Sequence, residues 1–186
     1  MFLEDLLKAF KHLATITRHH NEVFRLCRRC GLYWRGFWHD FSKLSPTEFW
    51  EGARYYTDGT HSPTVEARRE RGYSRAWTHH MGRNRHHFEF WKDYRPGEGL
   101  QPVEMPPVFF CEMICDRVAA SKIYHGASYT DSTALEYFNR QKKTYSVHPA
   151  TAERMEYVFT LLAERGEDAL FEYLRAYLKR EGGHRT

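Results

Sequence analysis

The sequence predicts an all-α protein, folded as a single domain of about seven helices. Apolar residues recur at steps of three and four over most of the chain, which is the period of an amphipathic helix. No segment shows the strict alternation of apolar and polar residues that marks a half-buried strand. The chain has 186 residues, of which 41% are hydrophobic, and no repeat is visible. This length and composition suit one domain with a sizeable core.

The first half of the chain predicts two helices and a polar loop. Apolar residues at helical spacing, from Leu3 through Leu13, predict an amphipathic helix that continues or restarts through Val23 and Leu26 and ends near Gly31. A short helix is expected after Pro46, because proline is favoured in the first helical turn. Residues 57–72 are polar and rich in turn-forming residues, which indicates a surface loop or lid with about one helical turn.

The second half predicts more helices, separated by clear breaks. Residues 74–92 are helix-like but contain Gly82, and residues 94–107 read as a loop. A helix over 107–124 follows a pair of prolines, and Thr133 with Glu136 predicts a capping box at the start of the next helix. Pro149 begins another helix, and a last one, over about 167–181, is expected to stop at Gly182-Gly183. The C-terminal helices thus occupy residues 131–181.

The net charge and the hydropathy of the chain bear on whether it binds nucleic acid or a membrane. The formal net charge is +4, from 28 Lys and Arg against 24 Asp and Glu, which makes nucleic acid an improbable partner. No apolar run approaches the roughly 20 residues that span a bilayer, so no membrane partner is expected. The N-terminus is acidic near its start, unlike a signal peptide. We therefore expect a cytoplasmic protein.

The four cysteines form two closely spaced pairs, Cys27 with Cys30 and Cys111 with Cys115. Such spacing is compatible with a zinc site. Both pairs, however, fall within segments of helical period, where this spacing places small apolar side chains on one helix face, whereas structural zinc usually draws cysteines from turns. Reduced cysteines in the core are the better interpretation.

The histidines suggest a metal site. Of twelve histidines, seven fall in tight groups: His19-His20, His39, His79-His80 and His86-His87. Asp116 lies in a segment that is apolar around most of its helical circumference, so it is expected to be buried. A buried carboxylate requires compensation, either by an arginine or by a metal ion.

The spacing of the histidines constrains the geometry of such a site. His39 and Asp40 are adjacent, and adjacent helical residues point in different directions, so both bind one metal only at a helix end or distortion. Two metals could share the pair, with Asp40 bridging them. In a straight helix His80 and His87 would lie about 10 Å apart along the axis, too far for one metal. We therefore expect a break or kink near Gly82, or different roles for the two histidines.

The order of these residues resembles the HD-domain superfamily of all-α metal-dependent phosphohydrolases. "RHHNEV" is similar to the family's first-helix motif, "HDFSKLSP" to its His-Asp doublet followed by lysine, "RHHFEFW" to a His-His-Glu stretch, and "EMICDRVAAS" to the final aspartate segment. The Gly-Tyr-Pro signature that follows the third motif in one subfamily is missing. The resemblance covers roughly residues 15–125. The chain also resembles a small uncharacterised bacterial and phage family that shares "HDFSKLSP.EF", "N.HH" and "EM..D".

The resemblance implies a site with one or two divalent transition metal ions, of iron, manganese, nickel, cobalt or zinc. One ion would be bound by His19, His39, Asp40 and Asp116, and a second by His80 with His86 or His87. The implied activity is hydrolysis of a phosphoester, of a nucleotide or another small phosphorylated metabolite, by a water that the metal activates. Catalytic roles would fall to Asp40, Lys43 and His87, and substrate contacts to Lys43, Arg83, Asn84 and His87.

Other functions suit the same residues. Some HD-like proteins with six ligands hold two irons that activate oxygen, and a histidine-rich ligand set suits iron or manganese better than magnesium. A diiron oxygenase is therefore one alternative, and a protein that keeps a metal for stability without catalysis is another. The amphipathic C-terminal helix, with Leu170, Leu174 and Leu178, could close the core or form a homodimer.

Overall fold

The computed structural model describes residues 2–181, and this part of the chain contains eight α-helices and one β-hairpin. The all-α prediction is confirmed, and the number of helices among the described residues is close to the seven or so expected. The helices are α1 (Phe2–Arg29), α2 (Tyr33–Trp38), α3 (Pro46–Arg54), α4 (Pro63–Arg71), α5 (Arg75–Met81), α6 (Pro107–His125), α7 (Thr133–Gln141) and α8 (Pro149–Glu181). The antiparallel strands β1 (Lys92–Arg95) and β2 (Gly99–Pro102) pair Lys92 with Pro102.

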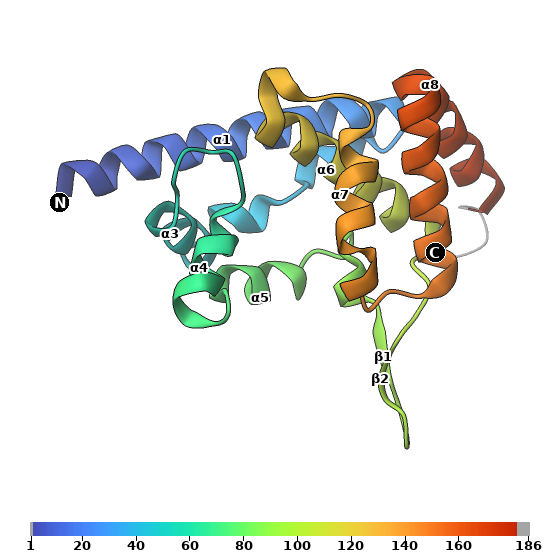
Figure 1. The fold of residues 1–186 in the computed structure, drawn as a ribbon, viewed down its shortest axis with the longest axis horizontal. Helices are drawn as coiled ribbons and strands as arrows, with labels where there is room; N and C mark the ends of the chain where they lie inside the picture. Colours follow the sequence, from blue (N-terminus) through green and yellow to red (C-terminus); the bar gives the residue numbers. More distant parts are fainter. Residues whose placement is uncertain (1, 182–186) are drawn as a thin grey trace.

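Helix α1 is one continuous helix along the length of the molecule (Figure 1). Its acidic first turn and basic last turn complement the helix dipole. Its N-terminal half packs against α3, and its C-terminal half packs against α2 and α6. Val23, Leu26 and Cys27 are fully buried in the second of these contacts. One helix therefore links the α3–α5 group to the group formed by α6, α7 and α8.

Helix α6 forms the centre of the core. It is buried around most of its circumference, as its apolar sequence predicts, and it packs against α1, α7 and α8. All four cysteines are free and buried, and Cys30 Sγ lies 3.8 Å from Cys115 Sγ at the contact between α1 and α6. The prediction of reduced core cysteines is confirmed.

The prediction of a surface loop or lid with about one helical turn over residues 57–72 underestimates the helix in its second half. Residues 63–71 form α4, which Ser62 caps by accepting a hydrogen bond from the Thr64 amide. Pro63 occupies the first helical turn, and Gly72 (φ 77°) ends the helix in the left-handed region that glycine adopts freely. The charged sequence of α4 buries only Ala67, so apolar periodicity could not reveal the helix.

The β-hairpin was not predicted. Every residue of β1 is exposed, so the strand has no buried face and leaves no alternation in the sequence. The hairpin follows α5 and precedes α6 in the sequence, and it projects away from the helices (Figure 1).

Two predicted helix breaks are confirmed, and one predicted cap is wrong. Helix α5 ends at Met81, before Gly82, and Gly166 (φ 77°) divides α8 into the two helices that the sequence predicts. The predicted stop at Gly182-Gly183 lies outside the described residues. The N-cap of α7 is Ser132 rather than Thr133, because the Thr133 hydroxyl accepts a hydrogen bond from the Thr130 amide instead.

Within residues 2–181, none of the helices combines the length and the apolar character needed to cross a bilayer.

Candidate metal centre

Four segments bring the predicted ligands together. Helix α1 supplies His19, the junction after α2 supplies His39 and Asp40, the end of α5 and the turn after it supply three histidines, and α6 supplies Asp116. The chain reverses after Trp38, and Asp40 adopts φ 56° and ψ 23°, the only positive φ of a non-glycine residue among those described. Because of this turn, the adjacent His39 and Asp40 side chains reach one centre without lying on one helix face.

The first group of side chains lies on the Oδ2 side of Asp40. His39 Nε2 is 3.2 Å from Asp40 Oδ2 and 3.5 Å from Asp116 Oδ1. His19 Nε2 is 3.0 Å from Asp116 Oδ1 and 3.9 Å from Asp40 Oδ2. Two imidazoles and two carboxylates therefore direct one atom each toward a common point, as in a metal site.

The second group lies on the Oδ1 side of Asp40. The Nε2 atoms of His80 and His86 are each 3.3 Å from Asp40 Oδ1. His87 joins them, with its ring centroid 4.2 Å from that of His86 and 4.8 Å from that of His80. The break at Gly82 allows this arrangement, because it brings His80 and His86, six residues apart in sequence, to one carboxylate.

The atoms that face the centre lack ordinary hydrogen bonds. Among the described residues, the Nε2 atoms of His19, His39, His86 and His87 and Oδ1 of Asp40 form no well-aligned hydrogen bond, although all are buried. Oδ2 of Asp40 forms an ion pair with Lys43. The imidazole nitrogens and carboxylate oxygens converge on the same space at short mutual distances. Buried polar atoms without partners are costly, and a cation that accepts their lone pairs would remove this cost. The residues therefore fit one or two transition metal ions, with Asp40 shared.

Two further carboxylates orient the histidines from behind. Glu112 Oε1 lies 3.1 Å from His39 Nδ1 and 3.4 Å from His86 Nδ1, while its other oxygen accepts a hydrogen bond from Arg35. Glu48 lies 2.8 Å from His80 Nδ1 through one oxygen and 2.6 Å from His79 Nδ1 through the other. A carboxylate on Nδ1 fixes the tautomer that leaves Nε2 free to bind metal.

Sequence reasoning missed both glutamates. Glu112 stands one helical turn before Asp116 on the same apolar helix, which was an available signal. Glu48 lies in the first turn of α3, where an acidic residue is ordinary because it complements the helix dipole. His39, His86 and Glu112 also form a third set of potential ligand atoms. Because Glu112 meets the Nδ1 atoms of both histidines, we assign it the orienting role.

The carboxylates of the centre stay ionised. Burial raises the pKa of Asp40, but the charges of His39 and Lys43 outweigh it and hold that pKa well below its usual range. Burial also raises the pKa of Glu112, and hydrogen bonds from His39 and His86 outweigh it, which brings that pKa to about 2. Both groups can therefore serve as anionic partners at neutral pH.

Two of the histidines stay neutral. Burial lowers the pKa of His19, and the charge of Lys43 adds to this effect. Burial likewise lowers the pKa of His87 well below its usual value, with the charges of His86 and His80 contributing. A neutral imidazole keeps the lone pair that metal binding or proton acceptance requires.

A cavity of about 390 Å³ opens beside the centre. His19, Asp40, His80, His87 and Asp116 line it, together with Lys43, whose ammonium nitrogen lies 2.6 Å from Asp40 Oδ2. Residues 60–65, which run from the loop before α4 into its first turn, also line the cavity. This is the part of the polar segment that was predicted as a loop or lid.

Two residues expected to contact substrate do not line the cavity. Arg83 is exposed and donates to the His79 carbonyl. The Asn84 amide donates to the Ser42 hydroxyl and to the His80 carbonyl, so it secures the turn that carries the histidines. His87, which was expected to face substrate, lies both at the cavity and within the second group of potential ligands.

Comparison with known proteins places the chain in a family. A family of unknown function, DUF5662, matches residues 8–161, well over half of the sequence. The chain belongs to the DUF5662 family. The DUF5662 match includes every candidate ligand and both orienting glutamates. No curated protein and no solved structure matches the chain.

Proposed function

We propose that this DUF5662 protein is a metal-dependent phosphohydrolase, the activity that its resemblance to the HD-domain superfamily implies. The observation that carries the proposal is the position of Asp40. Its two oxygens face two separate groups of ligand atoms at the wall of a cavity, and most of these atoms are buried without a hydrogen bond. A carboxylate shared in this way suits a dinuclear hydrolytic site.

The residues around the cavity can support hydrolysis of a phosphoester. Bound divalent metal ions would neutralise phosphoryl charge and make a water more acidic. Lys43, whose pKa is raised because the charge of Asp40 outweighs burial, keeps its positive charge and can hold a phosphoryl oxygen. His87 is neutral and its Nε2 lacks a partner, so this atom can accept the proton of the attacking water.

Metal content and activity test the proposal together. Protein purified without added metal or chelator would be measured by elemental mass spectrometry. It would then be assayed on a broad panel of phosphoesters with Mn²⁺, Fe²⁺, Co²⁺ and Ni²⁺. We expect bound transition metal and phosphate release, with both lost in Asp40→Ala and retained in the matched variant Asp93→Ala on the exposed β1 strand. A silent panel on metal-loaded protein would refute the hydrolase.

A second candidate function follows from the donor atoms. Besides His87, the two groups of ligands offer four histidine nitrogens and two aspartates, and nitrogen-rich sites suit iron. A diiron oxygenase is therefore tested in parallel, by oxygen consumption that requires both iron and a substrate. If metal removal lowers the melting temperature and neither activity is found, the metal is structural.

A further inference from the structure

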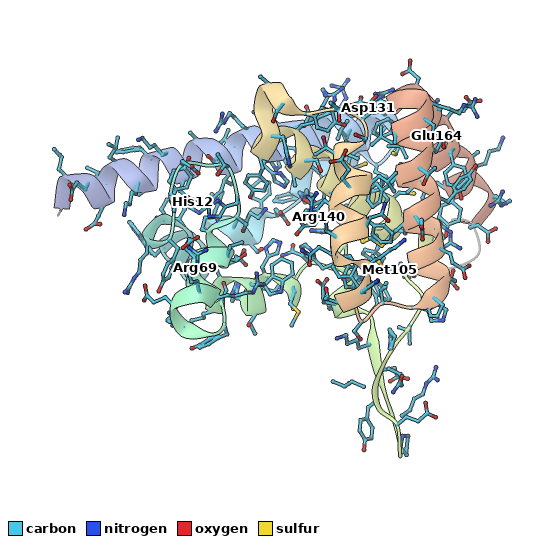
Figure 2. The ribbon with its side chains drawn as sticks, viewed as in Figure 1. His12, Arg69, Met105, Asp131, Arg140 and Glu164 are labelled. Carbon is cyan, nitrogen blue, oxygen red and sulfur yellow. The ribbon has the colours of Figure 1, made fainter. Side chains whose placement is uncertain are left out.

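His12 is a buried polar side chain in the cavity that the proposed chemistry does not use. It is 8% exposed, and its Nδ1 has no hydrogen-bond partner among the described residues. It lines the same cavity as His19 but lies seven residues earlier on α1. Figure 2 shows His12 on the side of α1 that faces α3 and α4. A buried imidazole without a partner suggests that a ligand supplies one.

The His12 ring is held in a fixed position. A Cβ atom at Gly52 would lie only 2.2 Å from His12 Nε2, so the ring packs directly on the backbone of α3. The rings of Phe49 and Tyr56 lie at centroid distances of 5.7 and 5.9 Å on the same helix and its end. Such packing makes the position of a hydrogen-bonding group predictable for a ligand.

Two hydroxyl groups accompany His12 in the cavity lining. The Thr15 and Tyr56 hydroxyl oxygens are 3.2 Å apart, and either can donate to the other. The Thr15 hydroxyl also donates to the Lys11 carbonyl and accepts from Arg18, so the Tyr56 hydroxyl is the freer of the two to bond a ligand. This end of the cavity, which we call the His12 end, therefore offers three neutral polar groups.

No side chain that is charged at neutral pH lines the His12 end, although the exposed Arg18 donates a hydrogen bond to the Thr15 hydroxyl at 3.3 Å. Burial, and then the positive charge of Lys43, lower the pKa of His12 to about 4. The charged side chains of the cavity lining come from the segments that hold the candidate ligands or lie next to them: Asp40, Lys43, Glu48, Asp116 and Arg117. An anionic substrate group would pair with Lys43 and a bound metal ion at the candidate metal centre, and the lining of the His12 end offers no such cation.

The helix sets the distance between the two ends. Seven residues of α1 separate His12 from His19, which corresponds to about 10 Å along the helix axis. Ile16, Trp77 and Tyr124 add apolar and aromatic surface to the lining. The cavity volume of about 390 Å³ lies at the small end of the range for ligand pockets and accommodates a ring system of that length.

We propose that His12, with the hydroxyls of Thr15 and Tyr56, recognises the far end of the substrate. The substrate is then a phosphate monoester whose organic part is uncharged, flat, and about 10 Å long, with a hydrogen-bonding group at its tip. This inference rests on the proposed phosphohydrolase function and specifies its substrate class. His12 acts on specificity, and the phosphoryl group is bound elsewhere.

Two monoesters of different reach test the inference in the metal-loaded protein. Adenosine 5′-monophosphate extends to the His12 end, and phenyl phosphate does not. We expect the wild type to prefer the longer ester in kcat/KM, and His12→Phe to reduce this preference about tenfold, mainly through KM. His12→Phe should hydrolyse phenyl phosphate at the wild-type rate, because this ester does not reach the His12 end. His148→Phe is the matched control, since His148 is not part of the cavity lining.

A milder variant guards against misfolding. Tyr56→Phe keeps the ring and removes only the hydroxyl, and we expect it to lower the same preference severalfold. If both variants hydrolyse the two esters with the wild-type preference, His12 recognition is overturned while the phosphohydrolase function stands.

A binding measurement separates the two proposals if no ester is hydrolysed. Adenosine, which lacks the phosphoryl group, would be titrated calorimetrically into chelator-treated protein. Binding that His12→Phe and Tyr56→Phe weaken about tenfold supports recognition at the His12 end, even where the phosphohydrolase function has failed. No binding, or binding that both variants leave unchanged, overturns the inference.

Discussion

The ammonium nitrogen of Lys43 lies 2.6 Å from Oδ2 of Asp40. That oxygen also faces the Nε2 atoms of His39 and His19, at 3.2 and 3.9 Å. Lys43 thus contacts the carboxylate at the place where a metal ion would bind. The side chain is half-buried and can turn from Asp40 toward a ligand in the cavity that it lines.

Replacement of Lys43 should separate metal binding from turnover. Lys43→Met removes a positive charge that opposes a cation at Asp40, so we expect metal affinity to rise about tenfold. Phosphoester turnover should fall about 10- to 100-fold, because a charged partner of the phosphoryl oxygens is lost. Metal titration and steady-state kinetics measure the two effects. A parallel loss of metal and turnover would show instead that Lys43 supports the ligands.

Glu112 should matter for metal affinity without being a ligand. Glu112→Gln keeps the shape of the side chain but removes the charge that orients His39 and His86. We expect metal affinity to fall about 10- to 100-fold with the helical content unchanged. Competition with a chelator of known affinity measures the metal affinity. Glu153→Gln, at an exposed position of α8, is the control. Equal affinities in the two variants would contradict the orienting role.

His12 should make the metal-free protein sensitive to mild acid. Its pKa is about 4 in the folded protein, against 6.5 ordinarily. Between these values the unfolded chain binds a proton that the folded protein resists, so stability falls as the pH drops from 6.5 to 4. The loss amounts to at most about 3 kcal/mol.

Urea unfolding at several pH values measures this loss. The curve for His12→Phe should be flatter than that of the wild type between pH 6.5 and 4, while His148→Phe should follow the wild type. Identical slopes for His12→Phe and the wild type would exclude a buried, neutral His12.

Gly52 should be required for the position of His12. In Gly52→Ala the new Cβ would meet His12 Nε2 at 2.2 Å, and the ring would have to move. We expect a loss of about 1–3 kcal/mol in the free energy of unfolding, as is typical of overpacking. Gly82→Ala is the control, because its Cβ would meet nothing closer than the Thr78 carbonyl at 3.4 Å. Chemical denaturation would reveal equal stabilities if His12 is free to move aside.

The parts of the fold that the sequence predicts are those with one buried face. Helix α1 and the confirmed break at Gly82 follow from apolar period and from glycine, which are local signals. Helix α4 buries only Ala67 and the strand β1 buries no residue, so neither leaves a periodic signal.

The sequence predicts those side chains of the candidate metal centre whose residue types are unusual on the apolar side of a helix. His39, Asp40 and Asp116 were recognisable for this reason, and the structure brings them together. Glu112 and Glu48 orient histidines from other segments, and a glutamate on a helix is ordinary until its neighbours are known. His12 is likewise ordinary in sequence, because only the packing of α1 on Gly52 makes it buried and unpartnered.

At position 40, the residue that best suits the backbone conformation differs from the residue that binds metal. A left-handed conformation costs a non-glycine residue about 1–2 kcal/mol, and glycine escapes most of this cost. A library varied at position 40 and selected only for resistance to unfolding should therefore enrich glycine. The same library selected for bound metal should return aspartate. Selection of this chain for stability alone would therefore remove a ligand of its candidate metal centre.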